Sequence, residues 1–208
     1  MARTPQDPKI RITEILDAAE DLFAVKGYRG TTISDISKEM GVAQGMLYYY
    51  FKSKEDILEA ILNRHGSTFI FKIKDMVCSS ITPSEKIGLT IGIILDGVRY
   101  KDEVFLNTVH DEQNLHIKDR LARQLKLLLT PWVLKTIEEG CSNHDFNVSH
   151  PQTAVDFIHI ITEFLINTLY EKIPDELLSP RLKMAEALIE KTLGAQEGTI
   201  HIRYKQVI

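Results

Sequence analysis

The sequence predicts an all-α fold. Its 208 residues include only 11 glycines and 7 prolines, which favours long helices over a turn-rich β fold. Apolar residues recur at the three- and four-residue spacing of amphipathic helices. A composition of 44% hydrophobic and 26% charged residues is ordinary for a globular protein. We expect two parts, an N-terminal three-helix domain over residues 1–56 and a larger helical domain over residues 57–208.

The first expected helix follows a short arm at residues 1–8. Gly27, with Lys26 in the preceding turn, is a suitable place for this helix to end. The apolar positions upstream of it form one helical stripe, which consists of Ile12, Ile15, Leu16, Ala19, Leu22 and Phe23.

Two short helices are expected next. Thr32 and Asp35 form a capping-box pattern at the start of the second helix, which ends at Gly41. The third helix covers Gln44–Tyr50, because Ser53 is already the N-cap of a fourth. Two short helices joined by a tight turn over residues 41–43 have the pattern of a helix-turn-helix.

Start signals mark the helices of the larger domain. They are Thr82-Pro-Ser-Glu85, Ser149-His-Pro-Gln152 and Ser179-Pro180, with further helical stretches at Glu103–His110 and Ile117–Glu139. The tail, Thr199–Ile208, alternates apolar and polar residues like a strand. We interpret it as a frayed end, with an arm packed on its own or a partner subunit as the alternative.

The third helix divides into two faces with different chemistry. At 100° per residue, an arc of about 140° holds an amide, a glycine and two phenols, while Leu47 lies outside it. A helix that reads DNA needs this division, because it presents hydrogen-bonding groups to DNA while an apolar residue anchors it. The exposed face consists of Gln44, Gly45, Tyr48 and Tyr49.

These segments resemble the N-terminal domain of TetR-type transcriptional regulators. The resemblance covers about residues 10–60 without a gap and rests on Gly27-Tyr28, Thr31-Thr-Ile33, Gly41-Val42 and Leu47-Tyr-Tyr-Tyr-Phe-Lys-Ser-Lys-Glu55. Ala43 departs from the family, which often has serine there. The resemblance implies DNA contacts at Thr31, Thr32, Gln44, Gly45, Tyr48, Tyr49 and Lys54. It also implies a homodimer that binds a palindromic operator and is released by a small-molecule effector.

The larger domain matches no further motif, and its site residues are hypotheses from pattern alone. For a ligand pocket we expect apolar residues: Phe69, Leu95, Val98, Phe105, Val109, Trp132, Phe157, Ile161 and Phe164, with His110 among them. Polar groups beside them, which include Glu163 and Asn167, are candidates for orienting a ligand. For a dimer interface of two helices from each subunit we expect Ala154, Ile158, Leu165, Leu182, Ala185, Leu188 and Ile189.

Other classes of function are less favoured. The net charge of −4 does not itself indicate nucleic-acid binding, but residues 42–54 contain two lysines and no acid. The histidines and the two cysteines form no metal or catalytic motif, so we expect no catalytic residue, metal or cofactor. The sequence has neither a membrane span nor a signal peptide, which predicts a cytoplasmic protein. The alternatives are a helical interaction module without DNA binding and a helical enzyme.

Overall fold

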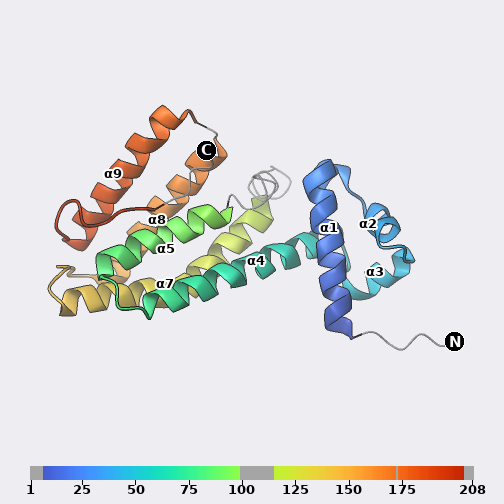
Figure 1. The fold of residues 1–208 in the computed structure, drawn as a ribbon, viewed down its shortest axis with the longest axis horizontal. Coiled ribbons are helices and arrows are strands. Elements are labelled where there is room, and N and C mark those ends of the chain that lie inside the picture. The colour runs from blue at the N-terminus through green and yellow to red at the C-terminus, as the bar shows by residue number, and fades with distance from the viewer. Residues whose placement is uncertain (1–6, 99–114, 172, 204–208) are drawn as a thin grey trace.

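A computed structural model describes residues 7–98, 115–171 and 173–203 (Figure 1). These residues form eight helices and no strand, which confirms the all-α prediction. The helices are α1 (Pro8–Gly30), α2 (Ile33–Glu39), α3 (Gln44–Tyr50), α4 (Lys54–Val77), α5 (Pro83–Val98), α7 (Leu115–Ser142), α8 (Pro151–Tyr170) and α9 (Asp175–Leu193). The predicted helix at Glu103–His110 lies outside the described residues.

Helix α1 begins earlier than expected, directly at Pro8. Asp7 is its N-cap and accepts a hydrogen bond from the backbone N–H of Lys9, while proline is favourable in the first turn. Gly27 interrupts the helix with a φ of 74°, a conformation that glycine adopts without strain. The expected end at Gly27 is therefore a kink, and the helix continues for three more residues.

Helices α1 to α4 enclose the first of two main hydrophobic cores. Each of the four helices contributes a side chain with no exposed surface, namely Ile15, Ile36, Leu47 and Ile57. Ile117, from the distant helix α7, is buried in the same core. The N-terminal domain is thus closed by a residue from the larger one.

Helices α5, α7, α8 and α9 form the body of the molecule. Their largest core cluster includes Ile87, Ile91, Ile137, Val155 and Ile189. Helix α4 passes from the N-terminal domain to this body, where it packs along α5 and α7 (Figure 1). The boundary that we proposed after residue 56 falls inside α4, so one continuous helix belongs to both parts.

The capping pattern at Thr82 is confirmed, but the start predicted at Ser179-Pro180 is wrong. The Thr82 N–H and hydroxyl both donate to the Glu85 carboxylate. Pro180 instead lies inside α9, which starts at Asp175 after Pro174 as its N-cap. Proline is better tolerated near a helix N-terminus than in the middle. Local sequence could not show that the helix already extended upstream of Pro180.

The described part of the tail packs on its own subunit. This confirms the alternative interpretation, a packed arm, and the interpretation as a frayed end is wrong. Ile200 and Ile202 are buried, and their backbone N–H groups donate to Glu190 and Glu186 of α9 at 2.9 and 2.7 Å. The carbonyl of Arg203 lies so close to α5 that only glycine fits opposite, at Gly92. Residues 199–203 therefore form an extended strap between α5 and α9.

Among the described residues, none of the helices combines the length and the apolar character required to cross a membrane.

Candidate DNA-binding site and ligand pocket

Helix α3 presents the polar face that the sequence predicted. Tyr48 is 51% exposed and Tyr49 is 81% exposed, whereas Leu47 has no exposed surface. Gln44 and Gly45 are exposed as well, and a Cβ atom at Gly45 would meet no atom within 4 Å. The structure thus brings these four residues together on one surface. Large exposed phenols gain nothing from the protein's own core, so they are available to a partner.

Thr32 is placed at the exposed start of α2. Its side chain accepts a hydrogen bond from the Asp35 N–H, and the Asp35 carboxylate accepts one from the Thr32 N–H at 2.8 Å. The Thr32 hydroxyl also donates to this carboxylate. These hydrogen bonds lower the pKa of Asp35 to about 2. Thr32 therefore fixes the start of α2 and still reaches solvent.

Thr31 does not present its side chain as expected. It is completely buried, and its hydroxyl donates to the carbonyls of Leu22 and Gly27 at 3.2 and 2.9 Å. These carbonyls lie near the kink in α1, where the regular helical hydrogen bonds are interrupted. A side-chain contact with DNA is incompatible with this burial, so we correct the role of Thr31 to a structural one.

Lys54 is also turned inward instead of toward a phosphate. Its ammonium donates to the carbonyls of Tyr28 and Thr31 at 2.7 and 2.9 Å and lies 4.1 Å from the centre of the Tyr28 ring. Partial burial lowers its pKa. Lys54 thus ties the end of α1 to the start of α4. The DNA contact expected at Lys54 is therefore replaced by a structural role in the N-terminal domain.

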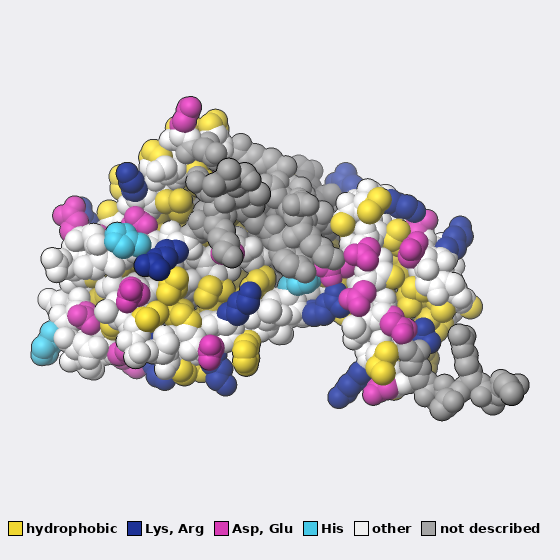
Figure 2. All heavy atoms as spheres, viewed as in Figure 1, with side chains coloured by type: hydrophobic (Ala, Val, Ile, Leu, Met, Phe, Trp, Pro, Cys, Tyr) yellow, Lys and Arg dark blue, Asp and Glu magenta, His cyan; other side chains and the backbone are white. Residues whose placement is uncertain are grey.

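Acidic side chains gather on α1, away from α3. Figure 2 shows several of them along α1 on the face displayed. Asp17 and Glu20 bind Arg64 of α4, and Glu20 also contacts His65 at 3.0 Å. These acidic side chains of α1 are therefore paired with basic side chains of α4 and join the two helices. The net charge of the chain is therefore a poor guide to the charge of the α3 surface.

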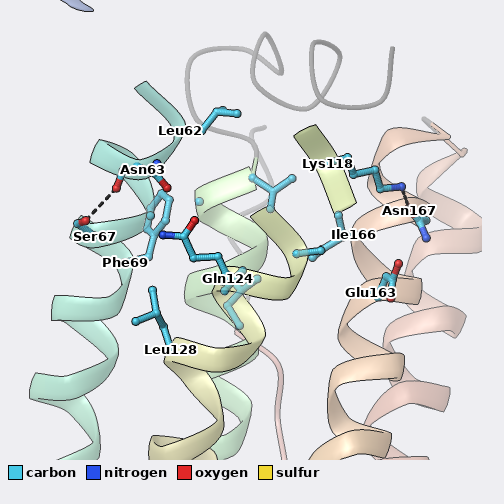
Figure 3. Close-up of a pocket in the computed structure, with 16 residues that line it drawn as sticks. Leu62, Asn63, Ser67, Phe69, Lys118, Gln124, Leu128, Glu163, Ile166 and Asn167 are labelled. Atoms are coloured by element: carbon cyan, nitrogen blue, oxygen red, sulfur yellow. Dashed lines mark hydrogen bonds between the residues drawn. The ribbon is translucent and has the colours of Figure 1, made fainter. Parts of the chain in front are cut away.

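A pocket opens between α4, α5, α7 and α8 (Figure 3). Its volume is about 180 Å³. Apolar side chains make up most of its wall, and polar groups are few, as in many small-molecule sites. The lining residues are Leu62, Asn63, Gly66, Ser67, Phe69, Ile94, Gly97, Val98, Lys118, Ala122, Gln124, Leu125, Leu128, Glu163, Ile166 and Asn167.

The sequence identified only part of this pocket. Phe69 and Val98 line it as expected, as do the polar candidates Glu163 and Asn167. The residues on α7 were missed, although Lys118, Ala122 and Leu125 follow a helical spacing of four and three. That spacing was the available signal, but it did not show which helices face one another.

Five expected pocket residues lie elsewhere, and three cannot be placed. Leu95 and Ile161 belong to the core of the body, and Trp132 packs in a smaller cluster with α4 and α5. Phe157 and Phe164 are about half exposed on α8 and are not among the residues that line the pocket. The remaining candidates, Phe105, Val109 and His110, lie outside the described residues.

The predicted dimer helices carry an exposed apolar face, but most of the predicted residues are not on it. Ala154, Ile158, Leu165, Ala185 and Ile189 are buried in the subunit's own core, and Leu182 is partly buried against it. Of the expected set, Leu188 is exposed. The exposed stripes lie roughly 100° further around each helix. We call them the α8–α9 face, which consists of Phe157, Ile160, Phe164, Leu177, Met184 and Leu188.

Among the residues that the structure describes, no group of three or more histidine, cysteine, aspartate or glutamate side chains is arranged to hold a metal ion.

Comparison with known proteins agrees with this geometry. Residues 15–61 match the family model of bacterial regulatory proteins of the tetR family. The chain is 38% identical over 78 residues to the fatty acid metabolism regulator protein of Bacillus subtilis, covering 38% of this chain and 40% of that protein. It is 27% identical over 158 residues to the transcriptional repressor KstR2 of Mycobacterium tuberculosis, covering 71% and 77%.

The fold is likewise similar to solved structures. The regulator FadR from Bacillus subtilis, solved in complex with stearoyl-CoA, superposes with a TM-score of 0.63 at 22% sequence identity. The superposition covers 91% of this chain and 99% of that one. Residues 15–61 thus form a helix-turn-helix domain that matches the tetR family of bacterial regulatory proteins, and the fold of the chain is similar to that of solved regulators.

Proposed function

We propose that the protein is a dimeric transcriptional repressor that binds a palindromic operator and leaves it when a small-molecule effector enters the pocket. The observation that carries the proposal is the exposed face of α3, where Gln44, Tyr48 and Tyr49 surround Gly45 above the buried anchor Leu47. Glutamine pairs well with adenine, and tyrosine hydroxyls bind phosphates. Gly45 lets the helix approach the DNA closely. At the start of α2, Thr32 adds a contact with the sugar-phosphate backbone of the DNA.

Dimerisation completes this site. Two copies joined through the α8–α9 face place two recognition helices about a twofold axis, which matches the symmetry of a palindrome. The exposed apolar residues of that face support the arrangement, since monomeric proteins seldom expose such stripes.

The effector that fits best has a long apolar part and a small polar end. Phe69, Leu125 and Ile166 provide an apolar wall, and Lys118 and Asn167 provide polar groups at one end (Figure 3). The relative from Bacillus subtilis is named for fatty acid metabolism, and a structural neighbour holds stearoyl-CoA. An aliphatic acid is therefore the first class to test.

The proposal includes no enzymatic activity. The relatives are named as transcriptional regulators, and the pocket chemistry is accounted for by ligand binding. A regulator of this kind works on the bacterial chromosome, and we accordingly propose a cytoplasmic location.

Fluorescence anisotropy on DNA from immediately upstream of the protein's own gene tests this function. We expect saturable binding that exceeds binding to scrambled DNA by about 1000-fold or more, weakens with salt and is reversed by an effector. Tyr49→Ala should abolish the preference while helicity and dimerisation are kept. If ligand-free protein bound upstream and scrambled DNA equally, and random-sequence selection also yielded no site, the repressor proposal would be rejected.

A further inference from the structure

The first turn of α7 touches both functional parts of the molecule. Ile117 has no exposed surface and belongs to the core of the N-terminal domain. Lys118, the next residue, lines the pocket and donates to Asn167 Oδ1 of α8 at 3.1 Å (Figure 3). Consecutive helical residues point about 100° apart, so one turn of α7 can contact both the N-terminal core and the pocket.

Two polar side-chain contacts join this turn to the start of α4. His116 Nε2 lies 3.5 Å from Glu55 Oε2, and Arg120 Nη1 lies 3.3 Å from Glu59 Oε2. Each pair is partly or largely exposed, so each contributes little stability. They lie on either side of Ile117 in the sequence, and the burial of Ile117 itself sets which side of α7 faces the N-terminal domain.

Helix α4 already connects the two parts through its continuous backbone. Its residue Leu62 belongs to the N-terminal core and also lines the pocket. The contact through α7 is different, because side chains alone make it and pocket groups on α8 can reach it through Lys118. Helix α8 supplies no residue to the N-terminal core among the described residues, so a change on α8 needs an intermediate to reach α3.

We propose that the first turn of α7 is a coupling element, in which Lys118 senses occupation of the pocket and Ile117 transmits it to the core beneath the recognition helix. This inference rests on the proposed effector-controlled function. A close-packed core does not absorb the displacement of a buried isoleucine gradually, so movement of Ile117 requires repacking of the core that also holds Leu47 and Ile36. Ile117 is thus a positioning residue that touches neither ligand nor DNA.

A test that needs neither effector nor DNA uses a side chain to fill the pocket. Glu163→Phe adds an aromatic ring at the exposed α8 edge of the pocket lining, where it can fold over the apolar wall. Amide hydrogen exchange over Ile33–Tyr50 then reports on α2 and α3. We compare three backgrounds: the natural chain, Ile117→Ala, and Ile15→Ala as a matched control with equal burial in the same core but on α1.

We expect Glu163→Phe to change exchange over Ile33–Tyr50 by about 5-fold or more in the natural chain and in the Ile15→Ala background. The change should fall below about 2-fold with Ile117→Ala. An equal change in all three backgrounds would assign the coupling to α4, and no change in the natural chain would remove the coupling altogether. Either result overturns the proposal.

Two safeguards keep the test decisive. If an alanine variant does not fold, Ile117→Val and Ile15→Val replace the pair, with a smaller difference expected in the same direction. The proposed function is tested separately by operator binding. Loss of coupling in a protein that binds its operator refutes only the role of α7. Intact coupling in a protein without an operator refutes only the repressor function.

Discussion

Lys54 holds the end of α1 and the start of α4 together through a single ammonium group. Two backbone carbonyls and the Tyr28 ring surround it, which leaves less of its hydrogen-bonding capacity for a phosphate. Hydrogen bonds from a charged donor contribute about 1.5–3 kcal/mol each. The role of Lys54 therefore belongs to the stability of the N-terminal domain.

Lys54→Met should accordingly lower the free energy of unfolding by about 2 kcal/mol. Operator affinity per folded molecule should change by less than about 3-fold, since no phosphate contact is lost. Urea denaturation and anisotropy on the same preparation measure the two quantities. Unchanged stability combined with a 10-fold or greater loss of affinity would instead assign Lys54 to the DNA.

Ala43 is the N-cap of α3 and makes no side-chain hydrogen bond there. A serine oxygen at this position can accept an N–H at the start of the helix, so Ala43→Ser should stabilise the domain by about 0.5–1 kcal/mol. Ala24→Ser, at an exposed position inside α1, is the control and should destabilise slightly. Urea midpoints measure both. A loss of stability with Ala43→Ser would contradict the capping geometry.

At the scale of elements, local signals predicted helix starts better than helix faces. The capping boxes at Thr32 and Thr82 are complete within four residues, so sequence alone identifies them. Helices α8 and α9 have two apolar stripes, and their periodicity is the same whichever stripe faces inward. Ile158 is buried while Ile160 is 61% exposed, a difference that only the packing of α7 and α9 decides.

The strap at residues 199–203 depends on small residues of α5. A Cβ atom at residue 92 would lie 2.1 Å from the Arg203 carbonyl oxygen, which is backbone and cannot rotate away. Gly92→Ala should therefore displace the strap and lower the melting temperature by several degrees, at a cost of about 1–3 kcal/mol. Calorimetry measures the shift.

Gly66→Ala is the matched control for this prediction. Gly66 lies within α4, and a Cβ atom there would meet no atom within 4 Å. Alanine there should be neutral or stabilising by up to about 1 kcal/mol, because it restricts the unfolded chain. Equal melting temperatures for the Gly92→Ala variant and the natural chain would mean that the strap does not pack on α5.

At the scale of the whole molecule, the exposed α8–α9 face is the interface of the dimer that we propose. Met184 is 62% exposed and Leu188 is 47% exposed, although both are apolar. Met184→Glu combined with Leu188→Glu should convert the dimer to a monomer, because burial of two carboxylates without partners is unfavourable. Sedimentation velocity at micromolar concentration measures the mass.

Phe71→Glu provides the control for the dimer prediction. Phe71 is 72% exposed on α4, outside the α8–α9 face, so its charged variant should remain dimeric. A monomer in this variant, or a dimer in the double variant of α9, would place the interface on another surface.

The two sites differ in how far sequence could predict them. All residues of the α3 face come from one helix of seven consecutive residues. The helical periodicity of the sequence is therefore enough to predict which side is exposed and which is buried. The pocket joins residues as distant as Leu62 and Asn167 from four helices, and no local pattern shows which helices meet. For Thr31, the sequence predicted its place at the start of α2. It could not predict the burial of the side chain, which depends on the end of α1.

Selection from a library of random-sequence duplexes tests the central claim, sequence-specific DNA binding by a symmetric dimer, most directly. The natural chain should enrich a palindrome whose half-sites are spaced for recognition helices about 34 Å apart. The Tyr48→Ala/Tyr49→Ala double variant should enrich no sequence, although it remains folded and dimeric. The same weak, sequence-independent recovery from the natural chain and the double variant would contradict the account.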